Sequence, residues 1–193
     1  MPLVDTHCHL TDDRFDEDRE DVLARSLEEL DWLVVIGENM ENAEAAVAVT
    51  RPRVYAAVGI HPYHAPELDD AAEGRLRELV RHAHVVALGE MGLDYYNEFS
   101  PRAAQAAAFE RQLALAAALD LPVVIHNREA DADSHALIAQ YIDRLPGCVM
   151  HCFGSDAAFA ARCVALGCHV SFAGNVTFKK AEPLREAARA VPM

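Results

Sequence analysis

Residues 85–126 read VVALGEMGLDYYNEFSPRAAQAAAFERQLALAAALDLPVVIH. Apolar, β-rich runs at Val85–Gly89 and Val123–His126 flank a long run rich in alanine and leucine at Pro101–Leu119, which indicates a strand, a helix and a second strand. Two strands joined through a crossover helix lie parallel in one sheet. Both strands are continuously apolar, as expected when helices bury both faces of the sheet. This stretch therefore predicts an α/β fold with a parallel sheet.

The same alternation runs through the whole chain. Strands are predicted at Pro2–Thr6, Trp32–Ile36, Val54–Gly59, Val85–Gly89, Val123–His126, Cys148–His151 and His169–Phe172. Helices are predicted at Glu17–Leu30, Met40–Thr50, Pro66–His82, Pro101–Leu119, Ala132–Leu145, Ser155–Leu166 and Phe178–Ala190. A closed barrel of eight such units takes about 250 residues. We therefore expect a TIM-like (β/α)8 barrel of the metal-dependent hydrolase type, truncated to about seven βα units and forming a single incomplete domain over residues 1–193.

Composition narrows the class of protein. The chain has 193 residues, of which 52% are hydrophobic and 25% are charged, and this is typical of a globular domain. Its formal net charge of −14 argues against a protein that slides along DNA, because such binding depends on cationic side chains. A nuclease remains compatible with this negative charge, since bound divalent ions make an acidic pocket locally positive. The apolar runs are shorter than the roughly 20 residues of a membrane span, and we expect a cytoplasmic protein.

Residues that bind metals follow the predicted strands. In parallel barrels, catalytic side chains cluster where the strands end. The candidates are His7 and His9 after the first strand, His61 and His64 after the third, Glu90 after the fourth, His126 after the fifth and His151 after the sixth. Because side chains alternate along a strand, the first two histidines point to one side. This regularity indicates a metallohydrolase.

Glu90 is the only glutamate in this set, and we assign it as the catalytic residue that bridges two divalent ions. A carboxylate can join two metals about 3.5–4 Å apart. We expect His7 and His9 on one ion and His126 and His151 on the other. Imidazole and carboxylate ligands suit Zn²⁺ or Mn²⁺, and Mg²⁺ stays open.

Six ordered segments resemble the TatD-like deoxyribonucleases, metal-dependent hydrolases of the amidohydrolase-like barrel group. They are VDTHCHL at 4–10, GIHP at 59–62, GEMGLDYY at 89–96, IHNREA at 125–130, HCF at 151–153 and SFAGNVTFK at 171–179. The resemblance implies the same five ligands and hydrolysis of DNA phosphodiester bonds, often from a 3′ end.

The family's usual last ligand is absent. It is an aspartate in a Glu-Thr-Asp-Ala/Ser-Pro-like segment on the eighth strand, beyond Val191–Met193. In the family it binds a metal and acts as the general base, so the resemblance implies impaired activity for the 193-residue chain. The first and seventh strands would keep open edges, which recruit other strands. We expect the final helix, through Phe178 and Leu184, to cover this gap, with a homodimer through the edge as the alternative.

Substrate contacts follow from the same segments. His64 and Arg128 are candidates for phosphate binding, and Arg128 has the alternative of a structural ion pair near Glu129 or with Asp94. Lys179 could also meet phosphate, although a surface role is favoured.

Other polar and aromatic side chains flank the ligands. Tyr95 and Tyr96 could stack on a splayed base, and packing is the favoured role for one of them. Asp5 and Asp94 are expected to orient ligand imidazoles.

Two other functions stay open. One is a metallohydrolase that acts on a small amide, lactone or ester; such enzymes often bridge their metals with a carbamylated lysine, and Glu90 at that strand end disfavours this interpretation. The other is a catalytically inactive protein that binds metal or a partner.

Overall fold

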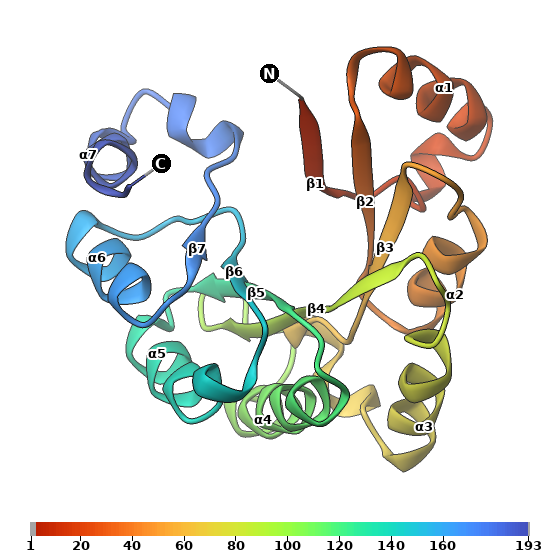
Figure 1. Ribbon diagram of the computed structural model, residues 1–193. Helices are drawn as coiled ribbons and strands as arrows, with labels where there is room; N and C mark the ends of the chain where they lie inside the picture. The colour runs from red at the N-terminus through yellow and green to blue at the C-terminus, as the bar shows by residue number, and fades with distance from the viewer. Residues whose placement is uncertain (1–2, 193) are drawn as a thin grey trace.

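The computed structural model describes residues 3–192 and contains one sheet of seven parallel strands. The strands are β1 (Val4–Cys8), β2 (Trp32–Gly37), β3 (Val54–Val58), β4 (Val85–Asp94), β5 (Val123–Arg128), β6 (Cys148–Met150) and β7 (His169–Val170). Each strand pairs with the next one along the chain, and the sheet curls into a half-barrel (Figure 1). The predicted fold is thereby confirmed. Pro2, the predicted start of the first strand, lies outside the described residues.

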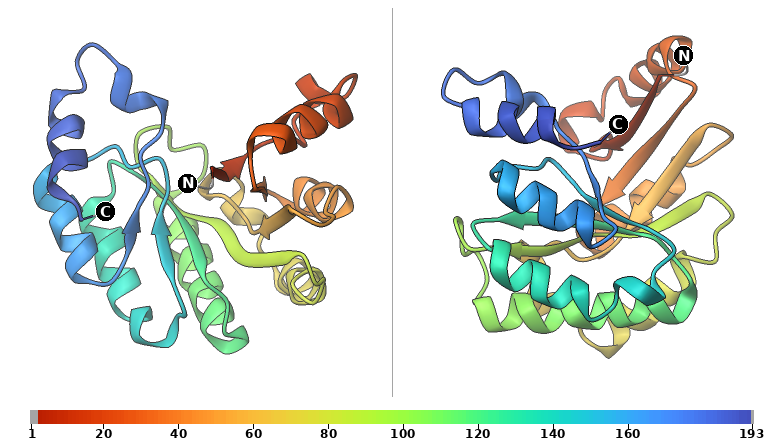
Figure 2. Two further views of the ribbon diagram at one scale, coloured as in Figure 1. Left: turned by 45° about the horizontal axis from the view of Figure 1, so that its top comes forward. Right: turned by 60° about the vertical axis from the view of Figure 1, so that its left-hand side comes forward.

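Among the described residues, seven α-helices cover the outer side of the curved sheet (Figures 1 and 2). They are α1 (Arg19–Glu29), α2 (Met40–Ala48), α3 (Asp70–Leu79), α4 (Arg102–Leu119), α5 (Asp131–Ala139), α6 (Ala157–Ala165) and α7 (Glu182–Ala190). Short 3-10 helices add η1 (Asp13–Phe15), η2 (Pro62–Glu67), η3 (Ile142–Arg144) and η4 (Gly174–Thr177). Within residues 3–192, no helix has the length and apolar character needed to cross a membrane.

The helix predicted at 66–82 is divided in two. Its first residues belong to η2, and α3 begins only at Asp70. The Asp69 side chain accepts a hydrogen bond from the Ala72 backbone N–H, which is the geometry of an N-cap. The polar cap therefore starts a new helix where an apolar pattern alone suggested a continuous one.

The core has an outer and an inner part. Between sheet and helices, large side chains such as Leu33, Leu76 and Phe109 are fully buried. The inner face of the sheet carries a smaller cluster, in which Val34, Ala57, Ala87 and Val124 belong to four successive strands. Beside this cluster lies an apolar hollow of about 440 Å³, whose lining also includes His7 and His151.

β4 extends beyond the predicted end of its strand. Its ten residues end at Asp94, whereas the sequence pattern predicted an end at Gly89. Gly92 has φ +146° and lies opposite His126 on β5; a Cβ atom there would come within 1.9 Å of the His126 carbonyl oxygen. Only glycine allows this close approach. The longer strand places Glu90 and Asp94 beside β5.

The two outermost strands are β1 and β7, and neither has a second strand partner among residues 3–192. The expected cover by the final helix is wrong. Leu184 and Ala187 are buried and α7 packs against α6, while Phe178 is 66% exposed. Figure 1 shows α7 apart from β1. Formation of a homodimer through this edge stays a prediction.

Candidate metal centre

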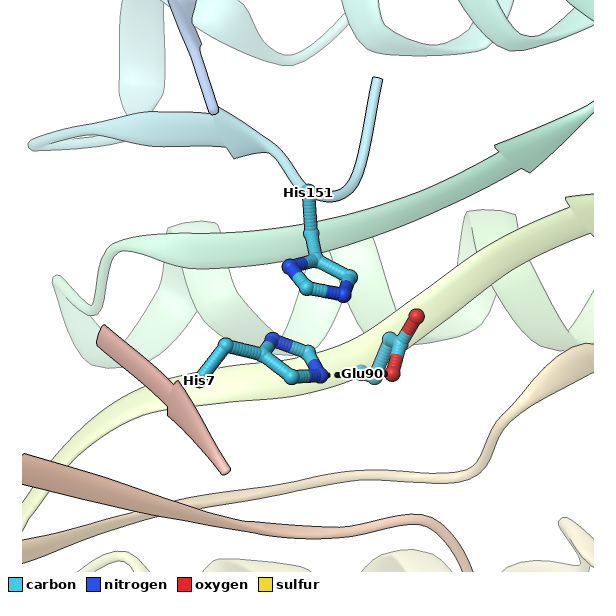
Figure 3. Close-up of side chains that lie close together, drawn as sticks. All are labelled: His7, Glu90 and His151. Carbon is cyan, nitrogen blue, oxygen red and sulfur yellow. Dashed lines mark ion pairs between the residues drawn. The ribbon is translucent and has the colours of Figure 1, made fainter. Parts of the chain in front are cut away.

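The centre is built around the carboxylate of Glu90, which is 3% exposed. His126 Nδ1 lies 3.0 Å from Glu90 Oε1, and His7 Nε2 lies 3.1 Å from Glu90 Oε2. His151 stacks on His7, with ring centroids 3.2 Å apart and planes at 7°. Figure 3 shows the side chains of His7, Glu90 and His151 close together, coming from β1, from the middle of β4 and from the segment after β6. A buried carboxylate therefore has imidazoles on both of its oxygens.

Three groups of side chains share this carboxylate. In each group, one donor atom of every member lies within 4.8 Å of the others. The groups are His7, Glu90 and His151; His61, Glu90 and His126; and His9, Glu38 and Glu90. The five predicted ligands thus converge on one place, but in a different pairing. His151 lies with His7, and His61 takes the position beside His126.

Sequence reasoning left His61 and Glu38 out of the ligand set. His61 follows β3 and is 3% exposed, with its ring centroid 4.4 Å from that of His126. Glu38 directly follows β2, and its Oε2 lies 3.6 Å from His9 Nδ1. Both stand at the carboxyl end of an apolar strand, so the signal that identified the other candidates applied to them as well.

Asp94 supports the centre from the β4 side. It is fully buried, and its Oδ2 accepts hydrogen bonds from His126 Nε2 at 3.1 Å and from the Tyr63 hydroxyl at 3.0 Å. The Gln105 side chain bonds both the N–H and the carbonyl of Asp94, at 2.8 and 3.0 Å. Asp94 therefore contacts a candidate ligand imidazole in the predicted manner. Asp5 does not, because its carboxylate accepts from the backbone N–H of His7.

Burial and hydrogen bonding set the charges of the centre. Burial lowers the pKa of His61 to about 3 and that of His151 to about 4. Burial also lowers the pKa of His126, but the hydrogen bonds to Asp94 and Glu90 outweigh this effect and raise the pKa to about 9. Burial likewise opposes ionisation of Glu90, yet hydrogen bonds from His126 and His7 hold its pKa well below the ordinary value. His61 and His151 are therefore neutral and Glu90 is ionised, which are the forms that bind divalent cations, whereas His126 is protonated at neutral pH and would give up a proton to a bound ion.

Two ring nitrogens of the centre have no hydrogen-bond partner among the described residues. They are Nδ1 of His7 and Nδ1 of His9, both buried. The Nε2 atoms of these two rings lie only 3.2 Å apart. A buried polar atom without a partner is costly, and a divalent ion would satisfy imidazole nitrogens at this place. The donor set of the centre therefore fits divalent metal ions.

A polar cleft of about 550 Å³ adjoins the centre at the ends of β5 and β6. Its lining includes His126, Arg128, His151, Asn175 and Phe178. The Arg128 guanidinium lies 4.0 Å above the ring centroid of Tyr96, and no carboxylate pairs with it in the part of the chain that the structure describes. The alternative of a structural ion pair for Arg128 is therefore not realised.

The other predicted substrate contacts lie outside this cleft. His64, on η2, pairs with Glu67 through atoms 2.9 Å apart. Lys179 is exposed in a turn before α7. Phosphate binding by His64 stays a prediction without geometric support from the cleft.

The two tyrosines after Asp94 differ. The Tyr95 hydroxyl donates to Asp133 at 2.8 Å, and the Arg102 guanidinium covers its ring at 4.2 Å. Tyr96 is 58% exposed. Tyr95 is thus the packed member of the pair, and Tyr96 is available for contacts.

Comparisons with known proteins agree with this architecture. Residues 4–193 match the family model described as TatD related DNase. An uncharacterized metal-dependent hydrolase of Bacillus subtilis, YabD, is 36% identical over 193 residues, which cover 98% of this chain and 76% of YabD. The 3′-5′ ssDNA/RNA exonuclease TatD of Cronobacter turicensis is 38% identical over 177 residues, which cover 90% of this chain and 67% of that protein.

Comparison with solved structures gives the same family. The TatD homologue YJJV of Escherichia coli K12 superposes with a TM-score of 0.90 at 30% identity, covering 98% of this chain and 75% of YJJV. A hydrolase TatD family protein from Entamoeba histolytica reaches a TM-score of 0.87 at 22% identity and shares the fold.

Proposed function

This chain belongs to the TatD related DNase family, and we propose that it is a divalent-metal-dependent nuclease that hydrolyses DNA phosphodiester bonds from the 3′ end of a single strand. The observation that carries the proposal is the convergence of imidazoles on the buried Glu90 beside a cleft that contains Arg128. A relative named 3′-5′ ssDNA/RNA exonuclease supports the polarity and the class of substrate.

In this proposal, the side chains that hold two divalent ions, Zn²⁺, Mn²⁺ or Mg²⁺, are His7, His9, Glu90, His126 and His151. Such ions, when bound, supply Lewis acidity and make water a nucleophile at neutral pH. Glu90 is the catalytic residue of the set, because its two oxygens contact imidazoles on opposite sides and one carboxylate can serve both ions. His61 and Glu38 are additional donors at the edges of the centre.

The remaining residues position the substrate and the ligands. Arg128 offers two parallel N–H donors to a phosphate, and the ring of Tyr96 holds its guanidinium at the cleft. Asp94 fixes the ring orientation of His126, and the Tyr63 hydroxyl in turn fixes Asp94. The β5 side of the centre is therefore held by hydrogen bonds that do not depend on the metal.

The cleft also bears on the rival metallohydrolase. A neutral amide, lactone or ester gives an unpaired guanidinium no anionic partner. Arg128 in the cleft wall therefore favours a phosphodiester over these small substrates.

The test is the cleavage of a 5′-labelled single-stranded oligonucleotide with added Mn²⁺, Mg²⁺ or Zn²⁺. We expect products that shorten from the 3′ end, and no cleavage in the presence of a chelator. An RNA strand of the same sequence and a neutral aryl ester are run in parallel. A protein that binds these ions in titration calorimetry but cleaves no strand would contradict the proposal, and cleavage of the ester alone would favour the small-molecule alternative.

A further inference from the structure

The loop between β4 and α4 exposes two large aromatic side chains. Phe99 is 70% exposed and Tyr96 is 58% exposed. Single apolar side chains on a surface are ordinary, but these two are held in place. The Phe99 ring packs edge-to-face against Tyr63, with centroids 4.6 Å apart and planes at 83°, and Tyr96 lies under the guanidinium of Arg128. We call Tyr63, Tyr96 and Phe99 the aromatic shelf.

The aromatic shelf is tied to the metal centre by direct contacts. The Tyr63 hydroxyl donates to Asp94, and Asp94 accepts from His126, which also contacts Glu90. The Tyr63 ring also packs edge-to-face against His61, with centroids 4.3 Å apart. Phe99 is therefore linked to Glu90 through the contacts of Tyr63, Asp94 and His126, even though Phe99 itself is exposed.

The aromatic shelf carries a positive charge in a chain whose net charge is −14. This charge is Arg128, which stacks on Tyr96 of the shelf, lines the cleft and has no carboxylate partner within residues 3–192. Exposed aromatic rings and a guanidinium without a carboxylate partner on the same shelf match the two parts of a nucleotide, a flat base and an anionic phosphate. Bases inside a duplex are stacked on one another, so only an unpaired base has a face free for such a ring.

We propose that the aromatic shelf is a nucleobase subsite, in which an unpaired base near the strand end stacks on Phe99 while the neighbouring phosphate meets Arg128. This inference rests on the proposed nuclease function and specifies its substrate. The subsite accepts single strands of any sequence, because every base has a face for stacking. It rejects ends that are fully paired.

The test compares two single-stranded oligonucleotides that differ only in whether the 3′-terminal nucleotides carry bases. We expect the parent protein to prefer the base-bearing strand by about tenfold in kcat/KM. Phe99→Leu keeps an apolar side chain but removes the ring, and it should lose this preference while cutting the abasic strand at the parent rate. Phe99→Trp should keep the preference. Leu3→Ala, a remote apolar residue that is 58% exposed, serves as the control and should behave like the parent.

A binding measurement separates this inference from the nuclease function. A strand with 2-aminopurine near its 3′ end loses fluorescence when that base stacks on a ring. Quenching by the parent and by Phe99→Trp, but not by Phe99→Leu, would support the subsite even if neither strand were cleaved. Equal quenching by parent and Phe99→Leu, or an unchanged tenfold preference in Phe99→Leu, would overturn it even if the protein proved to be a nuclease.

Discussion

The β5 side of the metal centre differs from its β1 side. On β5, both ring nitrogens of His126 are hydrogen bonded, one to Glu90 and one to Asp94. On β1 and directly after it, His7 and His9 each keep a buried Nδ1 without a partner among the described residues. The side chains of the β5 half are thus held by hydrogen bonds within the protein, whereas the β1 half still has imidazole nitrogens free to bind a ligand.

Position in the sheet explains the difference. β5 lies between β4 and β6, and β4 extends alongside it to Asp94. β1 is an outer strand that pairs only with β2 in the described part of the chain, with an irregular register between Asp5 and Cys8. An inner strand can surround a ligand with hydrogen-bond partners, and an outer strand has fewer neighbours to supply them. A bound metal ion therefore contributes more to the order of the side chains on the β1 side than on the β5 side.

Glu90→Gln should have the largest effect, because Glu90 joins the two halves. A neutral amide cannot balance the charge of two ions, and we expect the affinity for Mn²⁺ or Zn²⁺ to fall by at least about a hundredfold. Titration calorimetry measures the change. Glu41→Gln, which removes an exposed carboxylate at the start of α2, is the matched control and should bind like the parent.

His9→Ala sharpens the same experiment. It removes a donor of the β1 half only, so we expect the number of bound ions per chain to fall while the β5 half still binds. If the parent and Glu90→Gln bound ions equally well, Glu90 would not be a shared ligand of the two ions. If His9→Ala bound no ion at all, the β1 half and the β5 half would not bind ions independently.

Gly92→Ala tests the contact between β4 and β5 that builds the ordered half. The added Cβ would meet the His126 carbonyl oxygen at 1.9 Å, in a backbone conformation with φ +146° that other residues rarely adopt. We expect a loss of about 3 kcal/mol or more in the free energy of unfolding. Denaturant titration of the metal-free protein measures it. A variant as stable as the parent would mean that β4 and β5 can separate at this point without cost.

The pH dependence of stability isolates His126. Its pKa rises from 6.5 to about 9 in the folded protein, where burial is outweighed by hydrogen bonds to Asp94 and Glu90. A raised pKa stabilises the fold below the unfolded value of 6.5, and this contribution is lost as the pH rises through 9. We expect metal-free protein to lose about 2 kcal/mol between these pH values. His126→Gln should remove most of this slope in denaturant titrations, and an unchanged slope would assign it to other groups.

The sequence predicted which side chains meet at the centre better than it predicted the backbone that holds them. Apolar runs and the rule that parallel strands end at one edge sufficed to bring His7, Glu90, His126 and His151 together. The extension of β4 to Asp94 was missed, because Gly89 and Gly92 have low β-propensity and break the apolar run. Their role depends on a backbone approach to β5 that no local pattern reveals.

The grouping of ligands was also beyond sequence. His151 was expected beside His126, yet its ring stacks on His7. Strand order places β6, which His151 follows, between β5 and β7 and far from β1 at the opposite edge of the sheet, so only the curl of the half-barrel brings His151 and His7 together. Curvature arises from the packing of all seven strands, so pairings across the sheet need the three-dimensional structure.

Gly74→Ala should have the smallest effect, and its sign should be opposite to that of Gly92→Ala. Gly74 lies within α3 and is exposed, and a Cβ atom added to it would have no neighbouring atom within 4 Å. Alanine also restricts the unfolded chain and favours the helix, and we expect a gain of about 0.5–1 kcal/mol in the free energy of unfolding. Metal binding should stay at the parent level, because α3 contributes no residue to the groups that converge on Glu90. Replacing glycine by alanine at these two positions thus distinguishes a glycine that the centre requires from one that it does not. If Gly74→Ala were also destabilised, the loss of stability in Gly92→Ala could not be assigned to the β4–β5 contact.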